Sequence, residues 1–238
     1  AAARRWFSAT HWSVVLSATD QDGPQAAQAW ARLCRRYWYP LYAYVRRRGI
    51  SPDDAQDLIQ AFFERFLERD YLQSVNPEKG KFRSFLLAAL KNFMLDVRKH
   101  DHAAKRGRGQ MILSLDAQTA EERFRLEPAD VITPERLYER RWALTLMETV
   151  LGRLEKEFAE RSKSEQFESL RPLLLGDSDA QPYAVLAGRL GTTEGALRVA
   201  VRRMRQRYGE LFREEIANTV NREDEIEDEI NHLFAVLG

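Results

Sequence analysis

Apolar residues recur along most of the chain at the three- and four-residue spacing of a buried helix face. The clearest example lies toward the C-terminal end, at Leu197, Val201, Met204, Tyr208 and Leu211. No segment has the strict alternation of a half-buried strand, and no Asn-Gly hairpin signal or internal repeat occurs. The pattern therefore predicts an all-α fold.

The expected helices start and stop at residues with a physical reason to be there. A hydroxyl followed by a proline, as in Ser51-Pro52 and Thr133-Pro134, caps a helix and fits its first turn. Gly191 breaks one pattern, and Thr192 or Thr193 can cap the next. The predicted helices span 25–48, 52–70, 82–102, 135–161, 165–174, 183–190, 193–216 and 222–237.

The pair of helices at 183–190 and 193–216 has the form of a helix-turn-helix. Outside its apolar face, the second helix carries a series of arginines: Arg198, Arg202, Arg203, Arg205 and Arg207. A positive helix braced by a partner helix is suited to a DNA major groove. Short matches of this kind also occur by chance in helical proteins, so the motif alone predicts DNA binding without proving it.

Two helical domains are expected, one on each side of a segment with weak helical pattern and several glycines. The predicted division is 1–103, a linker at 104–134, a second domain at 135–216 and an acidic helix at 217–238. That last helix is amphipathic, with Ile226, Ile230, Leu233 and Leu237 on one face. It could pack on the second domain, cover the arginines of the helix-turn-helix with its acids, or receive a regulator.

Composition adds a charge pattern that the total hides. The chain of 238 residues is 44% hydrophobic and has a formal net charge of +1. Basic residues dominate 81–108 and 189–213, whereas acids dominate 214–229. Cys34 is the only cysteine, which excludes an intrachain disulfide and suits a reducing cytosol.

Several classes of protein are disfavoured. The N-terminal residues lack the apolar core of a signal peptide, and no run approaches the ~20 apolar residues of a membrane helix. We therefore expect a cytoplasmic protein without membrane insertion. Nucleophile elbows, phosphate-binding glycine loops and complete metal-ligand sets are absent from the sequence. This predicts a protein that is not an enzyme and that uses no cofactor and no metal.

Two N-terminal helices carry candidate interaction surfaces. In 51–72, Leu58, Phe62 and Phe66 form an apolar face opposite acids such as Asp53 and Asp57. That acidic face is either a solvated surface or a docking site for a basic helical partner. The helix after Lys81 combines inward aromatics with basic residues, which suits unpaired DNA bases and phosphates. A core helix with a basic solvent face explains the same pattern.

Three segments, in this order, resemble bacterial RNA polymerase sigma factors. SPDDAQDLIQAFFERF resembles the polymerase-docking helix of conserved region two, and GKFRSFLLAALKNFMLDVRKHDHAAKRG resembles the adjoining helix that melts and reads the minus-ten element. YAVLAGRLGTTEGALRVAVRRMRQRY resembles region four, which reads the minus-thirty-five element. The linker between the region-two and region-four segments is short, and this two-domain layout is similar to that of the extracytoplasmic-function (ECF) group.

The resemblance implies partners and residue roles. Core RNA polymerase would be contacted by Asp54, Asp57, Leu58, Gln60, Phe63 and Glu64. Minus-ten promoter DNA would be contacted by Phe82, Arg83, Asn92, Arg98 and Lys99. The minus-thirty-five duplex would be contacted by Thr193, Glu194, Arg198, Arg202 and Arg203. An anti-sigma or other inhibitory protein is implied as a regulator. The alternatives are a stand-alone helix-turn-helix regulator and a protein whose basic faces bind an acidic partner.

Overall fold

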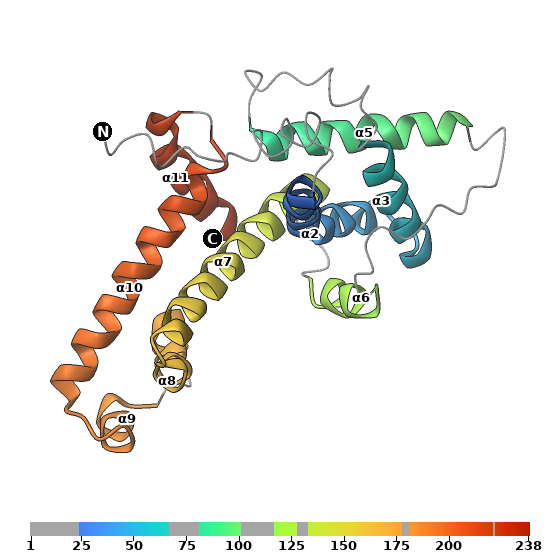
Figure 1. The fold of residues 1–238 in the computed structure, drawn as a ribbon. Coiled ribbons are helices and arrows are strands. Elements are labelled where there is room, and N and C mark those ends of the chain that lie inside the picture. Colours follow the sequence, from blue (N-terminus) through green and yellow to red (C-terminus); the bar gives the residue numbers. More distant parts are fainter. Residues whose placement is uncertain (1–23, 67–80, 101–116, 128–132, 178–180, 221) are drawn as a thin grey trace. The chain divides into compact units, whose positions relative to one another are not determined.

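The computed structural model describes residues 24–66, 81–100, 117–127, 133–177, 181–220 and 222–238 (Figure 1). Within these ranges every regular element is helical and none is a strand, which confirms the predicted all-α fold. The elements are α2 (Pro24–Arg47), α3 (Pro52–Phe66), α5 (Phe82–His100), α6 (Ala117–Arg125), α7 (Pro134–Glu160), α8 (Ser164–Leu175), α9 (Tyr183–Arg189), α10 (Glu194–Ala217), the short 3₁₀ helix η3 (Glu223–Glu225) and α11 (Ile226–Leu237).

The chain folds as two compact units. Unit 1 combines Ala1–Thr145 with Ile216–Gly238, and unit 2 is Leu146–Glu215. Unit 2 is therefore an insertion in the sequence of unit 1, and both α7 and α10 contribute residues to each unit. The predicted domain boundaries remain predictions.

Aromatic side chains of α2, α3 and α5 form the core of unit 1. The Tyr37 and Phe82 rings meet edge to face with centroids 5.3 Å apart, and Phe66 approaches Phe82 at 6.4 Å. Phe62 of α3 contacts Phe93 of α5 with ring centroids 5.8 Å apart. Such aromatic pairs stabilise a core beyond the area that they bury. They fix α3 and α5, the two helices that carry candidate surfaces.

Helix α6 lies inside the predicted linker and was not predicted. Arg46 of α2 donates two hydrogen bonds to the Glu121 carboxylate, both 2.9 Å long, and the Tyr42 hydroxyl donates a third of 2.8 Å. These bonds lower the pKa of Glu121 from its ordinary value, with the Arg46 bond as the largest cause. Polar bonds to α2 thus hold a helix whose own apolar face is small.

Unit 2 buries the apolar face predicted for the helix-turn-helix. Leu197, Val201, Met204 and Leu211 are buried, and Tyr208 is half-buried with its hydroxyl donating to the Met147 carbonyl at 3.3 Å. Phe158 of α7 and Phe167 of α8 meet edge to face at 5.7 Å. The helix-period pattern of 197–211 therefore marks core positions, as predicted.

The C-terminal helix contacts two other helices of unit 1. Its buried acid, Glu229, forms ion pairs with Lys81 and Arg83, and its His232 lies 3.4 Å from Glu139 of α7. Leu233, one turn further along α11, is buried as well. Charge complementarity with the basic start of α5 explains a placement that apolar periodicity alone cannot indicate.

Candidate protein-docking and nucleic-acid interfaces

Helix α3 begins with a capped, acidic first turn. The Asp54 backbone N–H donates to Ser51 Oγ at 3.2 Å, and the Ser51 hydroxyl donates to Asp54 Oδ2 at 2.7 Å. Asp53, Asp54 and Asp57 are exposed. Acids in the first turn also interact favourably with the positive end of the helix dipole. The cap therefore holds an acidic, accessible surface at a defined place on unit 1.

The predicted polymerase-binding residues divide by exposure. Asp54 and Asp57 are exposed, whereas Leu58, Gln60 and Glu64 are half-buried. The Gln60 amide donates to Glu64 Oε1 at 3.2 Å, which orders the later part of this face. Phe63 is only 4% exposed and packs beside Phe62 with ring centroids 5.5 Å apart. Phe63 thus supports the helix from below, and its direct contact with a partner would require the core to open.

Helix α5 distributes its predicted DNA-binding residues unevenly. Asn92 is exposed, but Phe82 is buried in the aromatic core. Arg98 and Lys99 lie in the last turn of the helix, and their side chains are outside the described part of the structure. Among the predicted DNA-binding residues of α5 whose side chains the structure describes, Asn92 is exposed and Phe82 and Arg83 are buried.

Arg83 is a buried cation and not an exposed one. Its side chain is 3% exposed, its Nε lies 2.7 Å from Glu139 Oε2, and its Nη1 pairs with Glu229. The guanidinium also lies over the Trp142 ring, 4.6 Å from the centroid. A buried charge persists only when it is paired and hydrogen-bonded. Here two carboxylates and an aromatic face satisfy that requirement, so the structure does not offer Arg83 to DNA.

The turn of the helix-turn-helix has the geometry expected of its residues. Gly191 adopts a positive φ of 61°, which glycine tolerates and other residues rarely do. Thr193 and not Thr192 is the cap: the Ala196 N–H donates to Thr193 Oγ1 at 3.2 Å. The Thr193 hydroxyl is thus engaged, although the residue is exposed.

The first half of α10 presents the predicted minus-thirty-five residues. Thr193, Glu194, Arg198, Arg202 and Arg203 are all exposed. Arg198 lies over the Tyr183 ring, 4.5 Å from its centroid, and 3.4 Å from Glu194. These contacts fix Arg198 in place while leaving it at the surface. All five residues are therefore accessible to solvent, which contact with DNA would require.

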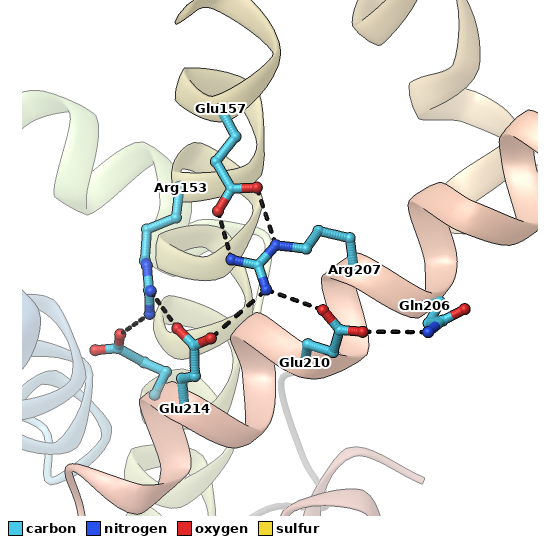
Figure 2. Close-up of polar contacts among 7 residues, drawn as sticks. Arg153, Glu157, Gln206, Arg207, Glu210 and Glu214 are labelled. Atoms are coloured by element: carbon cyan, nitrogen blue, oxygen red, sulfur yellow. Dashed lines mark hydrogen bonds and ion pairs between the residues drawn. The ribbon is translucent and has the colours of Figure 1, made fainter. Parts of the chain in front are cut away.

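The second half of α10 uses its arginines for folding. Arg205 donates to the Leu173 carbonyl of α8 at 2.7 Å. Arg207 grips Glu157 of α7 with two bonds of 2.9 and 2.7 Å, and it also donates to Glu210 at 2.9 Å (Figure 2). Bidentate arginine–carboxylate pairs are the strong form of this interaction.

The Arg207 cluster extends along the same helix. Glu214 lies 3.6 Å from Arg207 and 2.6 Å from Arg153, which also reaches Glu215 at 3.1 Å (Figure 2). The Arg207 hydrogen bond is the largest cause of the lowered pKa of Glu157. This network joins α7 to α10 inside unit 2.

Sequence reasoning missed the carboxylates that decide which arginines are accessible. Glu139 and Glu229 pair with α5, yet they lie 56 residues from Arg83 and 148 residues from Lys81. Glu157 is 50 residues from Arg207. A single sequence contains no signal for such distant pairs.

None of the helices in the described ranges combines the length and the hydropathy that crossing a bilayer would require. No group of three or more potential metal ligands occurs among the same residues. The sequence His100-Asp101-His102 contains potential metal ligands, but Asp101 and His102 lie outside the described ranges.

An exposed arginine face on the second helix of a helix-turn-helix is typical of DNA-binding proteins. Comparison with known families adds a finding for the N-terminal part of the chain: residues 33–104 match the family Sigma-70 region 2. The matched segment contains both α3 and α5. No curated protein and no solved structure matches the chain. The family match supports a sigma-70 family factor, with a role in binding RNA polymerase and melting promoter DNA.

Proposed function

We propose that the chain is an ECF-type sigma factor that directs core RNA polymerase to specific promoters. The observation that carries this proposal is the region 2 match over α3 and α5, followed in the chain by a helix-turn-helix with an exposed arginine face. The acidic start of α3 would dock on polymerase, α5 would meet the minus-ten element, and α10 would read the minus-thirty-five duplex.

The proposed factor performs no covalent chemistry. Separating and unstacking bases costs on the order of a few kcal/mol. Base pockets and phosphate contacts must offset this cost. Two DNA-binding surfaces on one chain can each bind weakly and still give high affinity together, because binding of the first raises the effective concentration of the second. The exposed Arg202 and Arg203 would supply the duplex half of this arrangement.

The docking surface can be tested by charge-neutral substitution. Asp54→Asn with Asp57→Asn removes two exposed acids from α3, and we expect weaker binding to core polymerase by roughly tenfold. Such a loss corresponds to about 1.4 kcal/mol. Glu155→Gln with Glu160→Gln is the matched control, because both acids are exposed on α7 of unit 2. Equal binding by the two variants would contradict the assignment of α3.

Transcription tests the function itself. Core polymerase is incubated with the chain and with fragments of the source genome, and the 5′ ends of the transcripts are mapped. Start sites that depend on the chain and share two spaced sequence elements are expected. A chain that binds a palindrome as a dimer without polymerase would instead be a stand-alone helix-turn-helix regulator.

We further propose control by an anti-sigma or other inhibitory protein, and a cytoplasmic site of action alongside polymerase. Both rest on the resemblance to ECF factors. Affinity purification of the full chain from its own cells, with and without added core polymerase, tests for such a partner. An inhibitor should be displaced when core polymerase is supplied in excess, whereas a protein that stays bound would be a different kind of partner.

A further inference from the structure

The C-terminal helix lies on the very start of the predicted promoter-melting helix. Glu229 of α11 is 0% exposed, and its carboxylate pairs with both Lys81 and Arg83. The buried Leu233 lies four residues further along α11, on the same helix face as Glu229. All of these residues belong to unit 1.

Glu139 of α7 joins the same cluster from a third helix. Its Oε2 atom accepts from Arg83 Nε at 2.7 Å and lies 3.4 Å from His232 Nε2 of α11. Helices α5, α7 and α11 thus meet around one guanidinium. The buried residues of α11 are Glu229 and Leu233, so this helix is held by fewer apolar contacts than the helices that form the aromatic core around Phe82.

The segment that covers α5 has the charge of a nucleic-acid backbone. The first turn of α11 contains Glu227, Asp228 and Glu229, directly after the acidic η3. Burial and the neighbouring Arg83 lower the pKa of Lys81, while Glu139, Glu225 and Asp228 act in the opposite direction. Carboxylates of α11 and η3 therefore surround a lysine at the position where α5 begins. Phosphates would compete for the same two cations.

We propose that α11 is an intramolecular competitor of nucleic acid: it docks on Lys81 and Arg83, and its release makes Lys81 and the Nη1 side of Arg83 available to melted DNA while Glu139 keeps the Arg83 Nε atom. The inference rests on the proposed function, because it takes the start of α5 to face promoter DNA. Since α11 is part of the same chain, its effective concentration at this surface is high. DNA held close by polymerase would overcome it, whereas free DNA would bind weakly.

Glu229→Gln tests the competition, with Glu223→Gln as the matched control. Both substitutions remove one negative charge from the C-terminal segment, but Glu223 is exposed in η3. The measurement is the affinity of the full chain for a fluorescent single-stranded oligonucleotide across a salt series. We expect E229Q to bind at least threefold more tightly than E223Q. Two additional phosphate contacts should also steepen the salt slope by about 1.4.

Equal affinities and equal slopes for the two variants would overturn the proposal. A purely structural role of Glu229 would lower thermal stability without changing the slope. Circular dichroism at the same salt concentrations separates that outcome from a change in DNA binding.

Hydrogen exchange on the unmodified chain gives a second test that does not depend on any variant folding. Amides of α11 should exchange faster when the oligonucleotide is bound, because Lys81 and Arg83 leave Glu229 for phosphate. Unchanged protection of α11 together with slower exchange in α5 would show that DNA binds without displacing it. Neither test uses polymerase, so failure of the transcription experiment and failure of this competition are separate results.

Discussion

Arg83 of α5 and Arg202 of α10 have the same predicted role and opposite surroundings. Arg83 is 3% exposed and is held by two carboxylates and the Trp142 face, whereas Arg202 is exposed on the second helix of the helix-turn-helix. Both stand in segments where basic residues dominate the sequence. The difference shows that a count of arginines predicts an electrostatic region, and that the distant acids decide which arginines remain available.

The same division occurs within α10 alone. Arg202 and Arg203 are exposed, but Arg207, little more than one turn later, is bound to Glu157 and Glu210. The first half of the helix carries exposed arginines, and the second half binds α7 through Arg207 and Glu157. Each substitution below changes one cation or its partner, and the expected effects on unfolding decrease from the buried to the exposed position.

Arg83→Gln should have the largest effect on stability. It leaves Glu139 and Glu229 without their shared cation in a buried site, and breaking a buried pair in this way costs about 3–5 kcal/mol. Urea unfolding followed by circular dichroism measures the loss. Arg202→Gln is the control, with an expected change within about 0.5 kcal/mol. Similar stabilities of the two variants would refute the contrast between the two regions.

Glu121→Gln tests an intermediate case, since Glu121 and Arg46 have side-chain exposures of 14% and 15%. Losing a charged, bidentate bond at the α2–α6 contact should cost about 1.5–3 kcal/mol at neutral pH. The folded-state pKa of Glu121 is lowered from 4.5, so its contribution is present above that pH and disappears as pH falls through the lowered value.

The difference in unfolding free energy between wild type and Glu121→Gln should therefore shrink in acid. Denaturant titrations at pH 7 and at successive values below 4.5 measure this dependence. Glu122→Gln, at an exposed neighbouring position, controls for the general effect of removing a carboxylate. A difference that stays constant in acid would show that the Glu121 carboxylate does not hold α6 through its charge.

Apolar periodicity predicted most of the fold because most helices bury a face. Leu197, Val201, Met204 and Leu211 occupy the core as their spacing indicates. It missed α6, whose contacts to α2 run through Glu121, Arg46 and Tyr42. A helix held by polar bonds to a distant segment leaves no apolar pattern, so sequence reasoning assigned these residues to a linker.

The candidate sites were predictable to different degrees for the same reason. The exposed face from Thr193 to Arg203 is a local property of one helix, and its cap and glycine turn can be recognised in the sequence. The accessibility of Arg83 depends on Glu139 and Glu229, which lie on two other helices. Only folding brings these three residues together, and no local sequence motif predicts their contact.

Arg207→Gln should have a small effect on stability and none on direct DNA contact. The Arg207 side chain is 36% exposed, so solvent screens its pairs and an expected loss of about 1 kcal/mol is appropriate despite several partners. The loss should diminish at high salt. Thermal unfolding at low and high sodium chloride measures it, and a salt-independent loss would point to packing instead of charge.

Arg202→Ala should change stability least and DNA binding most specifically. Because Arg202 is exposed, its substitution should leave the free energy of unfolding within about 0.5 kcal/mol of the wild-type value. If Arg202 contacts phosphate in the duplex, its removal should lower the slope of log affinity against log salt by about 0.9. Holoenzyme binding to promoter duplex across a salt series measures this slope. Arg207→Gln should keep the wild-type slope, because Glu157 and Glu210 already occupy that guanidinium. A slope change in Arg207→Gln but not in Arg202→Ala would reverse the assignment and place the DNA-facing surface on the second half of α10.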